Sequence, residues 1–392
     1  MAWSMPSTRF PSLLLYLIGA VAVVFVVFSY STFPNPVPAA VRQTETHHYL
    51  DDIRNETLGV EKIFAINLPS RPDKRDSIVL RSSVLGFHVD WVDGVTPDQL
   101  NPLAYPYNWH DDLTAREYAA RRAHMNALQH IVDKGISSAI IMEDDSDWDV
   151  TIKTQLQSMA LALRALQGTS PAATSSPYGD NWDLLWLGHC GINQRLNSTY
   201  FVSSHDPTVP PAHHFAPVFR DSPPINRTED TRLAFEAEDG VCSYLYAVSN
   251  HAAKKMLSAM SVSPTGMKEN LDSGGQLDIT LGRMCRANYL KCYAPYPSLT
   301  GRLMTSSDIR DSDEGEDQGR EKSRMPPDSA NVVYSTLKNI NRILDGESTV
   351  KAAWDDFPVQ EIRPSNVSVV GGTLHIPGAG ETLREIPFYP PS

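Results

Sequence analysis

Short runs of apolar or alternating residues, typical of strands, recur along the middle of the chain. They occupy residues 63–68, 87–95, 139–142, 181–188 and 242–249. The run at 139–142 is apolar throughout, which is typical of a short buried strand. We therefore expect a strand at each of these places.

Helical patterns separate several of these runs. Residues 70–73 and residues 114–117 have the spacing of capping boxes, in which a polar side chain is followed three residues later by an acid. Gly86 and Gly135 are placed to end the two helices that these boxes would begin. A further helix is expected at 250–260, directly after the last of the predicted strands.

The order of these elements predicts the fold class. Strand and helix alternate from residue 61 to about 260, which indicates an α/β domain with a mainly parallel sheet. Beyond it, 332–345 predicts an amphipathic helix and 368–376 a small hairpin. Polar, proline-bearing or acidic insertions, expected as surface loops, lie at 167–181, 203–233 and 306–329.

A long uncharged run near the N-terminus extends from Leu13 to Phe28. With the weakly polar residues up to Phe33 it reaches the roughly 20 residues that a helix needs to cross a bilayer. We therefore predict a transmembrane signal anchor at 12–33. The alternative is a signal peptide cleaved near residues 29–31, although so long an apolar region is more typical of an uncleaved anchor.

The charges that flank this run predict its orientation. Arg9 precedes the run and the next charged residue is Arg42, which favours a cytosolic tail at 1–11 and a luminal remainder. The proline-rich segment that follows lacks periodicity, so 34–60 is predicted to be an extended stem.

Two further features agree with the secretory pathway. N-glycosylation triplets begin at Asn55, Asn197, Asn226 and Asn366. The cysteines are Cys190, Cys242, Cys285 and Cys292. An even number permits two disulfides in any of three connectivities, with the last two cysteines nearest in sequence and free buried thiols as the alternative.

Composition narrows the choice of partner. Of the 392 residues, 41% are apolar and 20% charged, which is typical of a globular protein able to bury a full core. The net charge of −12 argues against a nucleic-acid partner, because phosphate binding requires a basic surface.

The most distinctive chemistry follows the apolar run at 139–142. Five acids lie within seven positions there, namely Glu143, Asp144, Asp145, Asp147 and Asp149. Such closely packed carboxylates repel one another unless water or a cation compensates them. Ligands bind at the carboxyl ends of strands in open α/β sheets, so these acids are placed to hold a divalent cation shared with a diphosphate.

Two other interpretations of these acids are an EF-hand and a solvated acidic turn. Asp145, Asp147 and Asp149 fit the first ligand positions of an EF-hand, but Val150 and Leu156 stand where glycine and glutamate are required. The acids are also compatible with a solvated acidic turn, since such clusters are common on surfaces.

Four segments together resemble a known family. They are "IFAINLPSRPDKRDSI" (63–78), "REYAARRAHMNALQHIVDKGISSAIIMEDD" (116–145), "WDLLWLG" (182–188) and "YLYAVSNHAAKKML" (244–257). Their order is similar to that in glycosyltransferase family 25, the lipopolysaccharide-biosynthesis and collagen galactosyltransferases, of which the chain resembles a divergent, fungal-type member.

The resemblance covers roughly 61–300 and leaves 301–392 as an acidic loop and C-terminal extension. It implies a GT-A-like nucleotide-sugar-binding domain and inverting transfer of a sugar from a nucleotide donor. One family segment, which corresponds to residues 116–124, departs from its usual pattern. Glu117 and His124 remain, but Arg116, Ala119, Ala120 and Ala123 replace its glycines, cysteine and serine.

The resemblance also implies roles for individual residues. Asp145, assisted by Asp144, would bind Mn²⁺ or another divalent cation. The expected substrate-binding residues are Asn67, Arg71, Arg75, His124, Glu143 and Gly188. Arginine suits a diphosphate because its planar fork donates two hydrogen bonds. The structural alternatives are helix-surface roles for both arginines, a capping role for Glu117 and a buried, hydrogen-bonded role for His124.

Inversion requires a base that takes the proton of the acceptor hydroxyl. Asp278, which opens an apolar segment after a glycine-rich turn, matches a late aspartate of the family and is our candidate for this base. Glu238 and Asp239 are the next candidates, and a capping role is the structural alternative for Asp278.

These observations predict a single-pass type II membrane protein of the Golgi or endoplasmic reticulum. The resemblance implies a metal-dependent glycosyltransferase that moves a hexose to a hydroxyl of a glycan, protein or lipid acceptor, and it alone implies galactose from UDP-galactose. The alternative is a non-catalytic luminal carbohydrate-binding or scaffold protein on a decayed glycosyltransferase fold, which the altered 116–124 segment favours.

Overall fold

A computed structural model describes residues 49–169, 174–214, 227–262, 271–304, 308–309, 328–329 and 331–376. The chain divides into the units Met1–His47 and His48–Ser392, and the described residues belong to the second. The predicted cytosolic tail, the membrane anchor at 12–33 and most of the stem therefore lie outside the described residues. Among the residues described, no helix is both long and apolar enough to span a bilayer.

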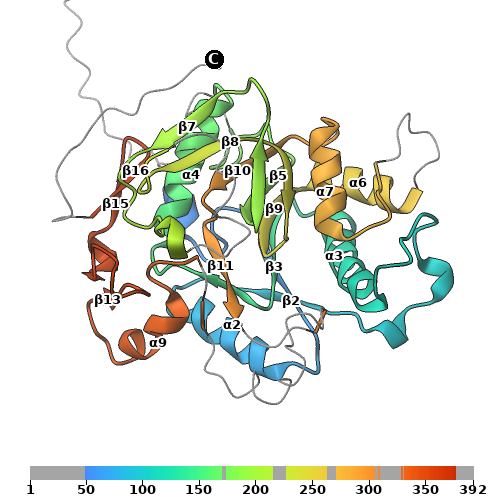
Figure 1. Ribbon diagram of the computed structural model, residues 1–392, viewed down its shortest axis with the longest axis horizontal. Helices are drawn as coiled ribbons and strands as arrows, with labels where there is room; N and C mark the ends of the chain where they lie inside the picture. The colour runs from blue at the N-terminus through green and yellow to red at the C-terminus, as the bar shows by residue number, and fades with distance from the viewer. Residues whose placement is uncertain are drawn as a thin grey trace, which may run out of the picture. The chain divides into compact units, whose positions relative to one another are not determined.

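A nine-stranded sheet forms the centre of the domain, in the order β2-β1-β3-β9-β5-β10-β8-β6, with β7 also paired to β8 (Figure 1). Its strands are β1 (Lys62–Asn67), β2 (Asp90–Asp93), β3 (Ser138–Glu143), β5 (Leu184–Gly188), β6 (Gly191–Gln194), β7 (Tyr200–Ser203), β8 (Arg232–Val241), β9 (Leu245–Ser249) and β10 (Cys292–Tyr296). All five predicted strands are confirmed.

The predicted parallel arrangement is confirmed only in part. The strands β1, β2 and β3 run parallel to one another, as do β5 and β10. In contrast, β8 and β9 run antiparallel to every neighbour. The sheet is therefore mixed, because β9 enters between β3 and β5 in the reverse direction.

Helices cover both faces of this sheet. One face packs against α3 (Ala115–Lys134), α6 (Asn250–Leu257) and α7 (Leu277–Arg286), which lie together in Figure 1. The opposite face packs against α2 (Pro72–Val84), α4 (Ile152–Leu166) and the short helix η1 (Asp51–Arg54). Along β3, Ile141 enters the first core whereas Ile140 and Met142 enter the second, as the two-residue period of a strand requires.

The ends of the helices show which local signals were reliable. At the start of α3, Thr114 and Glu117 form the predicted reciprocal capping box, and Gly135 ends the helix with a positive φ of 66°. The capping box predicted for Ser70 and Asp73 is wrong: α2 begins after Arg71, with Pro72 at its first position and no side-chain cap.

The chain joins the core ahead of residue 61. Ile53, Leu58 and Val60, which lie in the segment predicted to be a stem, are all buried against the second face of the sheet. Further short turns of helix are η2 (Pro97–Gln99), η3 (Pro102–Ala104), η4 (Ala212–His214), η5 (Ser258–Val262) and η7 (Pro364–Asn366).

The C-terminal residues add a third, smaller core. It contains Val150, Val333, Tyr334, Phe357, Leu374 and neighbouring apolar side chains. The elements around it are β4 (Ser146–Trp148), β11 (Thr300–Met304), β12 (Asp328–Ser329), α9 (Thr336–Leu344), β13 (Val350–Lys351), β14 (Glu361–Ile362), β15 (Ser368–Val370) and β16 (Thr373–His375). The predicted helix at 332–345 and the hairpin at 368–376 are both confirmed.

The four cysteines form two disulfides, Cys190–Cys242 and Cys285–Cys292. This is one of the three connectivities that the sequence permits, and it excludes the alternative of free thiols. The first disulfide joins the end of β5 to the segment that leads into β9.

Candidate functional site

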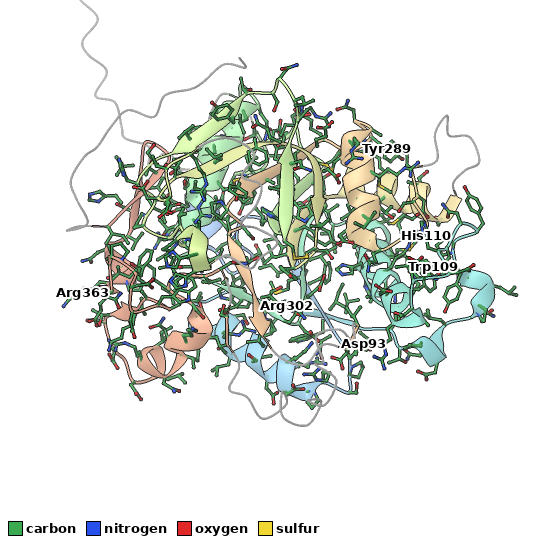
Figure 2. All side chains as sticks on the ribbon, viewed as in Figure 1. Asp93, Trp109, His110, Tyr289, Arg302 and Arg363 are labelled. Carbon is green, nitrogen blue, oxygen red and sulfur yellow. A yellow bond between two sulfur atoms is a disulfide. The ribbon has the colours of Figure 1, made fainter. Side chains whose placement is uncertain are left out.

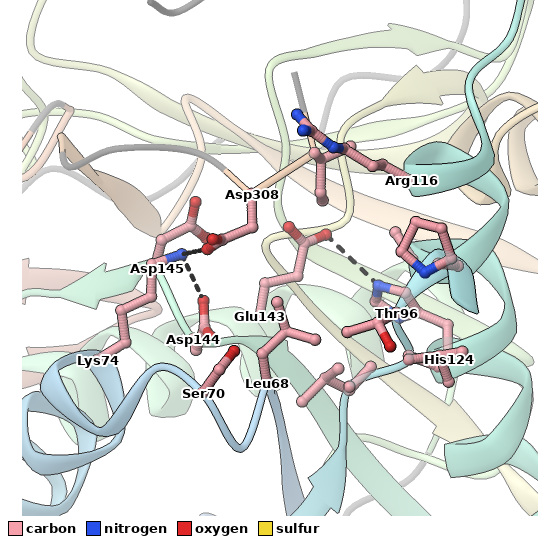
Figure 3. Close-up of a pocket in the computed structure, with 18 residues that line it drawn as sticks. Leu68, Ser70, Lys74, Thr96, Arg116, His124, Glu143, Asp144, Asp145 and Asp308 are labelled. Atoms are coloured by element: carbon pink, nitrogen blue, oxygen red, sulfur yellow. Dashed lines mark hydrogen bonds and ion pairs between the residues drawn. The ribbon is translucent and has the colours of Figure 1, made fainter. Parts of the chain in front are cut away.

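The carboxyl ends of β1 and β3 open into a cavity of about 370 Å³ (Figure 3). The two strands are parallel neighbours, and Ile66 pairs with Glu143 at their ends. The charged and polar residues that line the cavity are Ser70, Lys74, Thr96, Arg116, His124, Glu143, Asp144, Asp145 and Asp308. The predicted acids therefore do face a cavity at the end of a buried strand.

Asp144 is held by two hydrogen-bond donors from the β1–α2 region. Lys74 Nζ donates to one carboxylate oxygen at 2.9 Å, and Asn67 Nδ2 donates to the other at 2.9 Å. Burial alone would lower the pKa of Lys74, but the charges of Asp145 and Asp144 outweigh burial and raise it. Lys74 is therefore a protonated, buried cation with a charge partner on the wall of the cavity.

Asp145 is half-buried, and one of its carboxylate oxygens is buried without a hydrogen-bond donor among the described residues. Arg302, on β11 near the centre of Figure 2, lies with its Nε 3.3 Å from Oδ2. The other oxygen, Oδ1, accepts no hydrogen bond within the part of the chain that the structure describes. Burial, together with the nearby charge of Glu143, raises the pKa of Asp145 to about 6. A buried carboxylate oxygen without a donor is costly unless a cation satisfies it, so Asp145 fits a metal ligand.

Glu143 forms a separate group with His124 and Ser243. The Nε2 atom of His124 lies 3.5 Å from Oε1 of Glu143, and Ser243 Oγ donates to the same oxygen at 2.7 Å. Burial would raise the pKa of Glu143, but the hydrogen bond and charge of His124, followed by Ser243 and Arg302, lower it overall. His124 also contacts Tyr246 Oη at 3.1 Å through Nδ1, so both ring nitrogens have partners.

The two predicted arginines differ in position. Arg71 contacts Asp308, a residue of the cavity wall, and also forms an ion pair with Asp73 at 2.8 Å. Arg75 instead lies over the ring of Trp91, with its guanidinium carbon 4.5 Å from the ring centroid. Arg71 is therefore at the edge of the cavity, whereas Arg75 does not line it.

Two other predicted residues also lie outside the cavity wall. Gly188 ends β5, and a Cβ there would collide with Thr300 and with the backbone of Leu245, so close packing accounts for this glycine. Asp278 lies in the first turn of α7, where its carboxylate accepts hydrogen bonds from the backbone N–H of Cys242 at 2.7 Å and of Ile279 at 2.8 Å. Its assignment as the base stays a prediction.

The acids beyond Asp145 turn away from the cavity. Asp147 pairs with Arg81 Nη1 at 2.9 Å and accepts a hydrogen bond from Ser335 Oγ at 2.6 Å. Asp149 accepts from the backbone N–H of Tyr334 at 2.9 Å, and burial raises its pKa to about 6. The EF-hand interpretation is therefore excluded, because these side chains do not converge on one cation.

Sequence reasoning missed several residues of this site, including Lys74, Arg302 and Asp308. A signal for Lys74 was present, since Lys74, Ile78 and Arg81 have the spacing of one helix face and all three are buried. Arg302 carried no such signal, because β11 reaches Asp145 only through the tertiary fold.

Comparison with known proteins places this site in context. The chain is 24% identical over 148 residues to procollagen galactosyltransferase 1 of Danio rerio, an alignment that covers 34% of this chain and 22% of that protein. It is 25% identical over 153 residues to the probable inactive glycosyltransferase 25 family member 3 of Bos taurus, covering 36% and 24% of the two chains. The corresponding values for the inactive glycosyltransferase 25 family member 3 of Homo sapiens are 24% over 164 residues, covering 38% and 25%.

These similarities are partial. The chain spans about a quarter of the length of the curated relatives that it matches. No model of a known protein family matches the chain. Together with the mixed α/β sheet, the matches support a glycosyltransferase-like protein, related to glycosyltransferase family 25 at most.

Proposed function

We propose that the chain is a glycosyltransferase that moves a hexose from a nucleotide-sugar donor to a hydroxyl group, with inversion at the sugar. The observation that carries this proposal is the unsatisfied, buried oxygen of Asp145 beside the cations Lys74 and Arg302 at the carboxyl ends of two parallel strands. Galactose is the proposed hexose and UDP-galactose the donor, in keeping with the similarity to a procollagen galactosyltransferase.

The proposed cofactor is Mn²⁺ or another divalent cation, held by Asp145. When bound, such a cation would neutralise charge on the leaving diphosphate. Asp144 is proposed to assist from its place between Lys74 and Asn67, where it sets the position of the adjacent Asp145. Sites of this kind commonly use one or two carboxylates and complete the coordination with water and substrate phosphate.

The remaining residues of the cavity suit the other parts of the donor and acceptor. Lys74 and Arg71 would attract the diphosphate, for which each would exchange its contact with Asp308. Glu143, fixed by His124 and Ser243, presents a second carboxylate to the cavity, where it would accept hydrogen bonds from the donor's hydroxyl groups. Asn67 would orient this edge through its bond to Asp144.

The test of this function is a donor screen with the purified chain. We expect hydrolysis or transfer from one UDP-hexose, stimulated by Mn²⁺ and abolished by a chelator, because the diphosphate and Asp145 carry charge that needs a cation. Absence of turnover with every UDP-hexose, despite a folded chain and added Mn²⁺, would contradict the proposal.

A second candidate function has its own support. Two of the three similar proteins are named inactive, one of them probably so, and the cavity wall here carries Arg116, Ala119, Ala120 and Ala123. These observations favour a luminal protein that binds carbohydrate or serves as a scaffold without catalysis. Binding of a UDP-sugar or glycan without any turnover would distinguish this function from the first.

We retain Asp278 as the proposed base and expect Asp278→Asn to lower kcat by about 10²-fold, the lower end of what positioned proton transfer contributes. Donor KM should change little, because the donor is bound by the residues of the cavity. Steady-state kinetics with UDP-hexose would measure both values. Asp133→Asn is the control, since Asp133 is an exposed acid of α3 that pairs with Lys134 and does not line the cavity. Unchanged kcat in Asp278→Asn would remove Asp278 from the chemistry.

We further propose that the chain is anchored in the Golgi or endoplasmic reticulum membrane by 12–33, with the described residues in the lumen. This orientation is supported by Arg9, which lies close before the uncharged run, whereas no charge follows the run until Arg42. In sealed vesicles the part of the chain beyond the anchor should resist added protease and stay with the membrane after carbonate washing. Recovery of a soluble product that begins near residue 32 would show instead that the segment is a cleaved signal.

A further inference from the structure

Two adjacent histidines and one aspartate meet on the surface, away from the cavity. His213 and His214 form the end of η4, and Asp356 lies in a turn of the C-terminal region. The Nε2 atom of His213 lies 2.7 Å from one carboxylate oxygen of Asp356, and that of His214 lies 2.7 Å from the other. Among the residues that the structure describes, this is the group of His, Cys, Asp and Glu side chains whose ligand atoms all lie within 4.8 Å of one another.

The surroundings hold these groups in place. The ring of His214 stacks on that of Trp354, with centroids 4.3 Å apart and planes 8° from parallel. The turn that carries Trp354 and Asp356 is closed by Gln360, whose side-chain amide donates to the carbonyl groups of Trp354 and Asp355 at 3.0 Å. Phe357, which follows Asp356 in the chain, is buried in the third core. Asp356 is therefore presented by a fixed turn, and His214 is held by its stacking on Trp354.

The donor set favours one chemical class of ion. Two imidazole nitrogens with one carboxylate suit Zn²⁺ and similar transition-metal ions, whereas Mg²⁺ and Ca²⁺ prefer oxygen ligands. In a tetrahedral zinc site, bonds of about 2.1 Å would separate each nitrogen from its oxygen neighbour by about 3.4 Å. The two observed separations of 2.7 Å therefore need to open by less than 1 Å, roughly, to admit the ion.

We propose that His213, His214 and Asp356 bind one Zn²⁺ ion with three protein ligands and a fourth position open to water. Binding replaces the two histidine–aspartate hydrogen bonds, and any proton on either imidazole is released to solvent. Because His214 and Asp356 are 142 residues apart in the chain, the ion would clamp the C-terminal region to the segment before β8. This site does not depend on the proposed transferase activity, since none of its ligands lines the cavity.

The test measures the zinc retained by the purified full-length chain that carries Asp145→Asn, a substitution that removes the proposed metal ligand of the cavity. Equilibrium dialysis against Zn²⁺, with the bound metal quantified by mass spectrometry, should give one ion per chain. Mg²⁺ should not compete. His214→Ala and Asp356→Asn should each weaken binding by at least about 10-fold, because even an outer-sphere partner of a metal is worth this much.

His205→Ala is the matched control, since His205 is an exposed histidine that pairs with the carboxylate of Asp230 at 2.5 Å, and no second imidazole joins this pair within the described part of the chain. It should leave zinc binding unchanged. Zn²⁺ should also raise the thermal midpoint of the parent chain but not that of Asp356→Asn, because binding to the folded state alone stabilises it. Zinc binding that survives both ligand substitutions, or that is absent from the parent chain, would overturn the proposal.

Discussion

Replacing Asp145 with asparagine should abolish sugar transfer while leaving the fold intact. The substitution preserves the size of the side chain but removes the charge of a half-buried carboxylate whose buried Oδ1 atom has no donor among the described residues. Loss of metal-assisted charge stabilisation removes several kcal/mol, so we expect turnover of UDP-hexose to fall by about 10³-fold or more. The measurement is initial rate at saturating Mn²⁺.

A matched control separates this effect from a general change of charge. Asp76→Asn alters an exposed acid on α2, outside the cavity, and should leave turnover unchanged. Circular dichroism and the thermal midpoint of Asp145→Asn should match those of the parent chain. Full activity in a folded Asp145→Asn variant would refute the metal-ligand role and would favour the non-catalytic function only if the parent chain were inactive as well.

Replacing Arg81 with methionine should destabilise the domain by about 3–5 kcal/mol, the usual cost of leaving one member of a buried ion pair without its partner. Arg81 is 1% exposed and Asp147 is fully buried, and the guanidinium also donates to the carbonyl of Ser146 at 2.7 Å. The measurement is the free energy of unfolding from urea denaturation, with the change in midpoint interpreted at constant m-value.

Two further variants make this result specific. Arg75→Met removes an arginine of the same helix whose guanidinium lies over a tryptophan ring but pairs with no buried carboxylate among the described residues. Its loss of folding stability should therefore stay within about 1 kcal/mol. The double variant Arg81→Met/Asp147→Leu should recover part of the loss, because no buried charge is then left unpaired. Equal costs for Arg75→Met and Arg81→Met would show that the ion pair contributes nothing of its own.

Much of the secondary structure could be predicted because its signals are local. The limits of α3 follow from a capping box and a glycine that lie within a few residues of the helix ends. The strands β1 and β3 follow from uninterrupted apolar runs. The site benefited from the same locality, since Asn67 ends β1, Asp144 directly follows β3, and parallel neighbours bring their carboxyl ends together.

The features that escaped prediction depend on contacts between distant segments. The strand β9 runs antiparallel to its partners β3 and β5, and the sequence of β9 itself contains no local signal for this direction. Contacts between distant segments also decide which of the acids face the cavity and which turn away from it. Asp145 faces the cavity, while Asp147 faces Arg81 and Ser335. Alternation along a strand would give two residues that are two positions apart the same direction, so it could not have separated these acids.

The arrangement of β4 has a consequence for how the protein can be produced or recombined. This strand starts directly after Asp145. Its acid Asp147 accepts a hydrogen bond from Ser335, and Asp149, just beyond the strand, accepts one from the backbone of Tyr334 in the C-terminal region. A chain shortened after β11 would lose those anchors and leave Asp147 and Asp149 without hydrogen bonds that they accept in the whole domain. A fragment that keeps these hydrogen bonds and the described part of the third core therefore extends at least to Ile376. Any chimera that exchanges this transferase-like module must carry the C-terminal residues with it.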